Sequence, residues 1–142
     1  MLIHPSDPGA VAYLDPSDLA APGGHYSHVS VARGLAFVSG QLPITPAGLK
    51  LVGASFEDQA RQVLANVKTA LEAAGSAVGH LVQVRVYVDD MENWPAFNAV
   101  YREWAGSVRP SRAVVPTGPL HFGLKVEVEA IGLVAGASSP PV

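Results

Sequence analysis

In the run of residues 125–131, charged and apolar side chains alternate as far as Ala130, and this alternation constrains the fold more than any other feature of the chain. A period of two predicts a strand with one face in a core and the other face toward something polar. Lys125, Glu127 and Glu129 share the polar face. Residues 81–88 alternate in the same way and predict a second strand. Its apolar face is expected to carry Val82, Val84, Val86 and Val88, opposite Gln83, Arg85 and Tyr87.

A further β-type run, residues 112–115, stops at Pro116, which cannot donate a hydrogen bond to a neighbouring strand. If this run and residues 125–131 pair or lie in one sheet, Arg112 and Glu127 can converge on one spot. The pair would then form an anion clamp beside a proton acceptor. The alternative is a solvated strand face with a surface salt bridge, which contributes roughly 0–1 kcal/mol.

Two amphipathic helices are predicted between the strands. The first begins at Ser55, whose hydroxyl can cap the free amides of the first turn, and ends at Gly75. The second spans residues 93–104, with Pro95 in its first turn, where the missing amide costs little. Its apolar stripe, which favours a core over a ligand site, consists of Trp94, Phe97, Tyr101 and Trp104.

The remaining strands lie in the first half of the chain. Residues 25–31 and 35–39 predict a β-hairpin, and a third short strand is expected near residues 49–52. The order of elements predicts an α+β sheet with two helices packed on one face. We expect an extended arm over residues 1–24 with room for one short strand, a single domain over residues 25–135 and a flexible tail over residues 136–142.

Composition narrows the classes of function. The chain has 142 residues, a net charge of −3 and no cysteine, so it lacks a basic field for nucleic acid and thiolates for metal or nucleophilic chemistry. No apolar run is long enough to span a membrane, and the N-terminus does not resemble a secretion signal, which favours a cytoplasmic protein. A hydrophobic content of 49% with only 15% charged residues favours burial between subunits of a homo-oligomer.

Few local motifs point to chemistry. No phosphate-binding loop is present. His25 and His28, three residues apart on a predicted strand, would face opposite ways, so no metal site is expected. Ser39 fits a hydroxyl donor at a strand end better than a nucleophile, because no histidine is placed as its base. His121 lies in a predicted loop and could line a cleft.

Five motifs in the same order and separation resemble the Rid/YjgF family of reactive intermediate deaminases. Each is weak alone, but together they cover about residues 24–134. The motifs are Val38-Ser39-Gly40-Gln41-Leu42-Pro43, the helix pattern of residues 59–68, Asn98-Ala99-Val100-Tyr101, Arg109-Pro110-Ser111-Arg112 and residues 125–130.

This resemblance implies a chorismate-mutase-like α+β subunit that assembles as a homotrimer, with a site in each cleft between subunits. It also implies hydrolysis of 2-imino acids, the tautomers of reactive enamines, to 2-keto acids and ammonia. No cofactor or metal is required for that reaction. The expected partners are therefore a small 2-imino or 2-keto acid and further copies of the chain, with no nucleic acid and no membrane.

Carried over residue by residue, Arg112 corresponds to the arginine that grips the substrate carboxylate, and Glu127 to the glutamate associated with the attacking water. Glu129, on the same strand face, could share or take that role. The resemblance also assigns substrate contacts to the site mouth, to one strand end and to the second helix, through Tyr26, Ser39, Gly40 and Asn98.

The chain departs from the family pattern at two places. Val114 stands where many members have a cysteine, which affects reactivity toward thiol reagents more than hydrolysis. Residues 116–123 also differ and are expected to reshape the cleft. Two other functions remain open: a non-catalytic regulatory trimer that binds a small carboxylate, and a ribonuclease, which the acidic balance disfavours.

Overall fold

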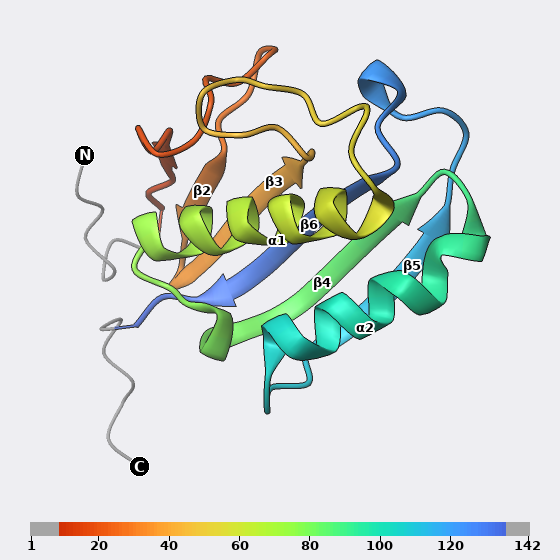
Figure 1. Cartoon of the computed structure of the whole chain (residues 1–142). Helices are drawn as coiled ribbons and strands as arrows, with labels where there is room; N and C mark the ends of the chain where they lie inside the picture. The colour runs from red at the N-terminus through yellow and green to blue at the C-terminus, as the bar shows by residue number, and fades with distance from the viewer. Residues whose placement is uncertain (1–8, 136–142) are drawn as a thin grey trace.

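A single mixed sheet organises the molecule in the computed structural model, which describes residues 9–135 (Figure 1). The strand order is β1-β2-β3-β6-β4-β5, with β4 and β5 parallel and the other neighbours antiparallel. The strands are β1 (Ala12–Leu14), β2 (Val29–Ala32), β3 (Leu35–Gln41), β4 (Leu81–Val88), β5 (Ser111–Pro116) and β6 (Val126–Leu133). The predicted residues 136–142 tail and the first eight residues of the predicted arm lie outside the described range.

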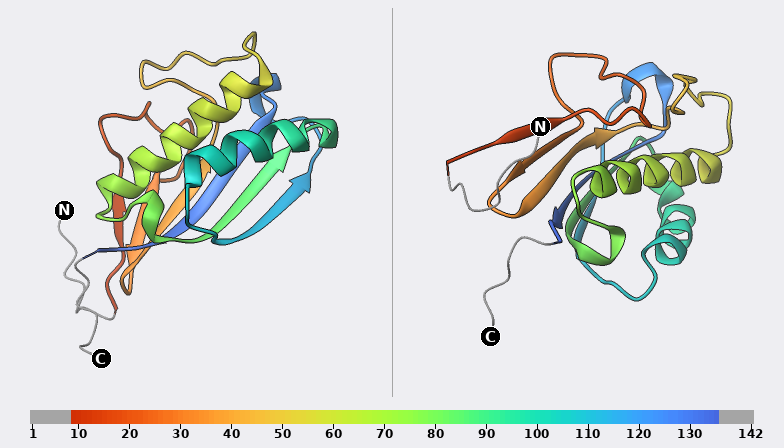
Figure 2. Two further views of the ribbon diagram at one scale, coloured as in Figure 1. Left: turned by 60° about the horizontal axis from the view of Figure 1, so that its bottom comes forward. Right: turned by 90° about the vertical axis from the view of Figure 1, so that its left-hand side faces the viewer.

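Two helices, α1 (Phe56–Ala73) and α2 (Trp94–Ala105), pack side by side on one face of the sheet (Figure 2). Among residues 9–135, no helix covers the other face. Single 3₁₀ turns precede β4, α2 and β6, at Val78–His80, Met91–Asn93 and His121–Gly123. This arrangement confirms the predicted α+β class with both helices on one face. No helix within residues 9–135 is long and apolar enough to cross a membrane.

The start and end of α1 follow from its sequence. The Ser55 hydroxyl accepts a hydrogen bond from the Asp58 amide at 3.1 Å, as predicted for a helix cap. Gly75 ends the segment with a φ of 81°, a conformation that costs a glycine little. The position of α1 over the sheet is therefore set at both ends by residues outside its apolar stripe.

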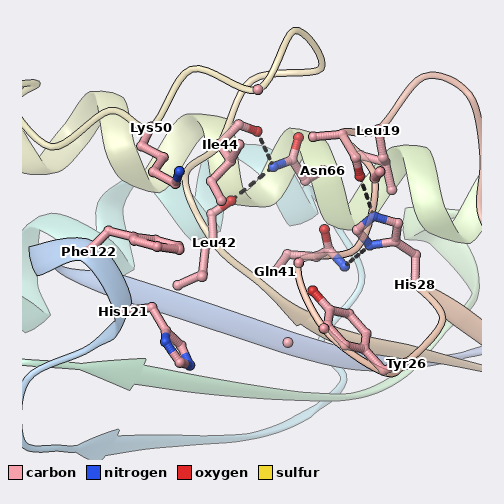
Figure 3. Close-up of a pocket in the computed structure, with 16 residues that line it drawn as sticks. Leu19, Tyr26, His28, Gln41, Leu42, Ile44, Lys50, Asn66, His121 and Phe122 are labelled. Carbon is pink, nitrogen blue, oxygen red and sulfur yellow. Dashed lines mark hydrogen bonds between the residues drawn. The ribbon is translucent and has the colours of Figure 1, made fainter.

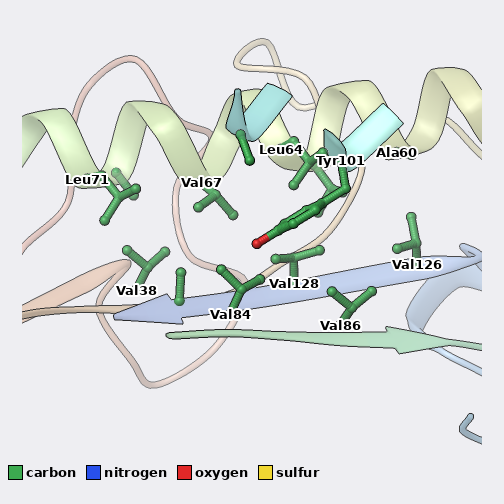
Figure 4. Packing of buried hydrophobic residues seen from close by; sticks show 14 of the residues in the cluster. Val38, Ala60, Leu64, Val67, Leu71, Val84, Val86, Tyr101, Val126 and Val128 are labelled. Atoms are coloured by element: carbon green, nitrogen blue, oxygen red, sulfur yellow. The ribbon is translucent and has the colours of Figure 1, made fainter. Parts of the chain in front are cut away.

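The core lies between the helices and the sheet (Figure 4). Side chains of β4 and β6 face α1 and are removed from solvent, as the period of two predicts. Full burial of one valine or leucine side chain stabilises the fold by roughly 1.5–3 kcal/mol. The fully buried members of this layer include Leu64, Val67, Leu71, Val84, Val86, Val88, Val126 and Val128.

The strand predicted near residues 49–52 is wrong. Only one isolated bridge, between Ile44 and Lys50, forms there. The carbonyls of Leu42 and Ile44 accept hydrogen bonds from the Asn66 side chain, at 3.0 and 2.8 Å, instead of entering a ladder. The segment is consequently a loop fastened to α1, and the third strand of the first half is β1.

Two predicted strands also differ from the structure, one in where it begins and the other in the face on which Val82 lies. The hairpin strand predicted over residues 25–31 begins at Val29, because the His28 amide donates to the Asp15 carboxylate instead of to a neighbouring strand. Val82 does not join the apolar face of β4 and is 46% exposed. The register between β4 and β6 shifts between Leu81 and Gln83, which turns Val82 away from the core.

Candidate functional site

The sheet topology separates the two residues on which the predicted site depends. Strand β4 lies between β5, which carries Arg112, and β6, which carries Glu127. Arg112 is in register with the buried Val84 and so lies on the face covered by the helices. Glu127 is in register with Tyr87 and lies on the open face. The two runs therefore share one sheet, as predicted, but Arg112 and Glu127 do not converge within one copy of the chain.

Arg112 is held by α2. Its Nη1 donates a hydrogen bond to Asn98 Oδ1 at 3.2 Å, and its Cζ lies 4.8 Å from the ring centre of Trp94 and 4.7 Å from that of Tyr101. Such cation–π contacts orient a guanidinium without neutralising it. No carboxylate within residues 9–135 lies within 4 Å of it. The guanidinium thus keeps donors for an anion, while Val114, two residues further, packs against the core.

Glu127 is a half-buried carboxylate that rests on Gly40. A Cβ at position 40 would overlap the Glu127 carboxylate in this position, so any larger residue there would require the Glu127 side chain to move. Burial raises the pKa of Glu127 above its usual range; the positive charge of His121 opposes this shift and the charge of Glu129 adds to it. In the part of the chain that the structure describes, no hydrogen-bond partner is found for Glu127. It is the freer of the two glutamates on this strand.

Glu129 is occupied by its neighbours on the open face. The Tyr87 hydroxyl donates a hydrogen bond to it, and Arg85 Nη1 lies 3.8 Å from its Oε1. The hydrogen bond to Glu129 is the main reason why the pKa of Tyr87 is raised. Between the two candidate acids, the contacts therefore favour Glu127 for a role toward a ligand.

Three of the predicted site residues, Tyr26, Gly40 and His121, line one pocket of about 390 Å³ (Figure 3). The pocket opens between the loop before β2, the end of β3 and the turn before β6. Ser39 lies beside Gly40, and its hydroxyl donates to the Ser27 carbonyl at 2.6 Å, which ties β3 to the loop before β2. Its observed role is thus to hold the pocket wall.

A buried hydrogen-bond network in the pocket wall was not predicted from the sequence. Gln41 Nε2 donates to the Ser39 carbonyl and lies 3.1 Å from His28 Nδ1. His28 Nε2 lies 2.6 Å from the Ala20 carbonyl, which can only accept, so the proton of the neutral ring belongs on Nε2. Asn66 fastens the opposite wall to α1. No pattern in the sequence marked these polar residues as buried, because their partners lie on segments far apart in the chain.

Lys50 and Phe122 lie together at one end of the pocket, with Tyr26 and His28 at the other end (Figure 3). The Lys50 ammonium lies 4.4 Å from the ring centre of Phe122. Phe122 has a φ of 62°, a left-handed conformation that costs a bulky residue roughly 1–3 kcal/mol. Sequence analysis flagged the 116–123 segment but neither residue, since their contact joins positions more than seventy residues apart in the chain.

Within residues 9–135 no group of three histidine, aspartate or glutamate side chains is arranged to hold a metal ion. His28 is engaged in the network in the pocket wall, and His25, which the sequence placed on the same strand, lies in the loop before β2.

Comparisons with known proteins agree on one family. The sequence model described as Endoribonuclease L-PSP matches residues 17–134. Protein HMF1 of Saccharomyces cerevisiae is 39% identical over 75% of this chain and 81% of its own length. A RutC family protein of Pyrococcus horikoshii is 39% identical over 78% of this chain and 87% of its own length. Another S. cerevisiae relative, MMF1, is named as mitochondrial.

Solved structures show the same fold. The structure of TdcF from E. coli with bound serine superposes with a TM-score of 0.81 and 29% identity, and covers 86% of this chain and 98% of its own. The yjgF gene product of E. coli superposes with a TM-score of 0.79 and 31% identity, and covers 86% of this chain and 98% of its own.

Proposed function

Because this chain belongs to the Endoribonuclease L-PSP family, also called the Rid/YjgF family, we propose that it hydrolyses reactive 2-imino acids to 2-keto acids and ammonia. The proposal places the reaction in clefts between the subunits of a homotrimer. The observation that carries it is the unpartnered, half-buried Glu127 carboxylate over Gly40, beside a pocket. A carboxylate with a raised pKa in a cleft is a candidate general base.

Arg112 supplies the binding half of the proposed reaction. A guanidinium binds a carboxylate through two parallel hydrogen bonds and stays charged at any working pH. Asn98 and the two aromatic rings already hold the side chain, so little of its freedom would be lost when a substrate binds. The proposed target of Arg112 is the α-carboxylate that all 2-imino acids share.

Glu127 supplies the chemical half. It would accept a proton from a water molecule as the water oxygen forms a bond to the imine carbon and the electrons of the C=N bond move to nitrogen. Glu127 would return this proton to the nitrogen, which becomes an amino group on a carbon that now carries a hydroxyl. It would then transfer the hydroxyl proton to the amino group, so that the C–N bond breaks, ammonia leaves and the oxygen remains as a keto group. Water and imine are the only reactants, and their positioning would supply much of the acceleration.

The separation of Arg112 and Glu127 within one subunit is the reason for the assembly in this proposal. Each copy offers an arginine on one sheet face and a glutamate on the other, so a complete set requires two copies. The open sheet face has partly exposed apolar side chains, including Phe37, which is 38% exposed. Such a face suits burial against another subunit.

The direct test follows the imine itself. An amino-acid oxidase would generate 2-iminopropanoate or 2-iminobutanoate in the presence of semicarbazide, and semicarbazone formation would be recorded. We expect the native protein to suppress semicarbazone formation and the Arg112→Ala variant to lose this effect. Absence of suppression by the native protein with several imino acids would contradict the deaminase proposal. The remaining function would then be the non-catalytic binding of a small carboxylate.

A complementation experiment tests the shared site. Arg112→Ala and Glu127→Gln would be purified separately and then unfolded and refolded together. If one subunit supplies the arginine and another the glutamate, the mixed oligomers contain some sites with both native residues and regain part of the activity. No recovery, with mixed oligomers demonstrated by mass spectrometry, would contradict a site made by two subunits.

The cytoplasmic location and the ribonuclease alternative need separate tests. The location stays a prediction, since one relative carries a mitochondrial name. The family description includes endoribonuclease, but the chain has a net charge of −3. RNA cleavage that falls with further purification while deaminase activity is retained would assign the cleavage to a contaminant.

A further inference from the structure

The pocket beside Gly40 is larger than the smallest imino acids require. Its volume of about 390 Å³ lies within the range of roughly 300–1,000 Å³ that is typical of sites for ligands much larger than a four-carbon acid. Leu42 and Ile44 form part of its wall and suit the methylene groups of a longer side chain. The pocket therefore has room for a substrate side chain beyond the reacting carbon.

The side chains that line this pocket contribute positive charge and no negative charge. Among the described residues that line it, Lys50 contributes an ammonium group and no residue contributes a carboxylate. No carboxylate in residues 9–135 lies within 4 Å of the Lys50 ammonium. A positive charge in a concave, partly apolar site attracts anions more strongly than the same charge on a flat surface.

The position of Lys50 is supported by its surroundings. The loop that carries it is closed by hydrogen bonds from the Thr45 amide to the Leu49 carbonyl and from the Leu51 amide to the Pro43 carbonyl. The Asn66 side chain fastens the same loop to α1. The ammonium group of the exposed Lys50 contacts the Phe122 ring at this end of the pocket (Figure 3). An anion in the pocket would thus meet a positioned cation.

We propose that Lys50 selects substrates whose side chain ends in a second anionic group, that is, 2-imino dicarboxylates. This inference rests on the proposed function, because it assigns the reacting carbon to the Gly40 side of the pocket, where the neighbouring Glu127 carboxylate lies against Gly40. The distal carboxylate lies against the Lys50 ammonium, and the methylene groups between the two ends lie along Leu42. Phe122 is a positioning residue that acts through Lys50.

The test compares two substrates in one assay. The ratio of kcat/KM for 2-iminoglutarate over 2-iminobutanoate would be measured for the native protein, for Lys50→Gln and for Lys50→Glu. We expect the native ratio to exceed one, and Lys50→Gln to lower it by roughly three- to tenfold, the effect of one partly solvated ion pair. Lys50→Glu should lower the ratio further, because it places like charges together.

Two controls separate charge at this position from charge in general. Lys68→Gln removes an exposed lysine of α1 outside the pocket and should leave the ratio at its native value.

Phe122→Leu should lower the ratio through a higher KM for 2-iminoglutarate, and Phe122→Tyr, which keeps the ring face, should restore it. A ratio that Lys50→Gln does not change, in a protein that hydrolyses 2-iminobutanoate, overturns the inference and leaves the deaminase proposal intact.

Binding measurements keep the inference testable if no imine is hydrolysed. Calorimetric titration with 2-oxoglutarate and 2-oxobutanoate would then replace turnover. Tighter binding of 2-oxoglutarate that is lost in Lys50→Gln would support the anion-selective end of the pocket, although the deaminase proposal had failed. Equal binding of the two acids, or a preference that survives in Lys50→Gln, overturns the inference.

Discussion

The two faces of the sheet differ in what their side chains contact. On the covered face, the valines that β4 and β6 direct toward the two helices are fully buried. On the open face, the residues between those valines are charged or aromatic, and Glu127 has no hydrogen-bond partner within residues 9–135. Strand β6 contributes to the core and to the candidate site, since its alternate residues lie on opposite faces of the sheet. The covered face stabilises the fold, and the open face together with the pocket carries the candidate chemistry.

Arg112 is an exception, because this candidate binding residue lies on the covered face that otherwise stabilises the fold. It lies on the covered face but at the edge strand β5, where α2 leaves its guanidinium only half-buried. A polar group can occupy the core side of a sheet when an aromatic layer and one amide support it. The following substitutions test this comparison between the two faces.

The largest effect on stability is expected on the covered face. Leu64→Ala removes a fully buried side chain from α1 and should lower the free energy of unfolding by about 2–5 kcal/mol. The exposed Val52 gives the matched control, Val52→Ala, which should change it by less than about 0.5 kcal/mol. Urea unfolding at one protein concentration measures both. Equal effects of the two variants would contradict the described core.

The next effect distinguishes the two glutamates of the open face. Glu127→Gln should lower kcat for imine hydrolysis by about 100-fold or more, the usual contribution of a general base. Glu129→Gln should lower it far less, because Glu129 is held by Tyr87 and Arg85. Steady-state kinetics of both variants measures the difference. The reverse order would transfer the catalytic role to Glu129.

A smaller effect on catalysis is expected from Arg112, which lies on the edge strand β5 under α2. Arg112→Ala should lower kcat/KM by roughly 10- to 100-fold, the loss of a charge-assisted hydrogen-bonded contact to the substrate. Arg112→Lys should recover only part of it, because an ammonium lacks the planar fork. Kinetics with 2-iminobutanoate measures the loss, and a thermal melt checks that the fold persists. Native activity in Arg112→Ala would show that the substrate carboxylate binds elsewhere.

The smallest effect concerns the pH dependence of stability. Burial makes the pKa of Glu127 higher in the folded than in the unfolded chain, where its ordinary value is 4.5. Between the two values the folded chain binds more protons, so stability falls as the pH rises through that window. Glu127→Gln cannot ionise and should melt slightly above the native protein at pH 8, with the difference lost below pH 4.5. A native protein that melts higher at pH 8 would contradict the burial penalty.

Hydrophobic periodicity in the sequence correctly predicted the helices and strands that are determined by residues close together in the chain. The periods of α1, α2, β4 and β6 depend on neighbouring residues, and these elements were confirmed with small shifts at their ends. A strand was wrongly predicted near residues 49–52, where only an isolated bridge forms, because the carbonyls of Leu42 and Ile44 on the facing segment bond to Asn66, more than twenty residues away in the chain. The periodicity of a short segment cannot reveal a hydrogen-bond donor as distant in the chain as the Asn66 amide.

The candidate site was predictable only in part for the same reason. Tyr26 and Gly40, which the resemblance assigned to a site, line one pocket together with His121, which the sequence placed in a loop that could line a cleft. The faces on which Arg112 and Glu127 lie depend on the strand order, with β4 between β5 and β6, which no single motif encodes. Lys50 was missed because its contact with Phe122 joins two loops. The catalytic roles assigned to these residues stay predictions.

The central place of β6 also bears on how the chain folds. This strand joins β3 to β4 in the sheet, yet it follows all the other described strands along the chain. The β2–β3 hairpin and α1 need only local contacts, whereas the two halves of the sheet meet through pairings of high sequence separation, which form slowly. During synthesis on the ribosome, β3 and β4 each keep an unpaired edge until residues 126–133 emerge, and unpaired edges are where partly folded chains aggregate.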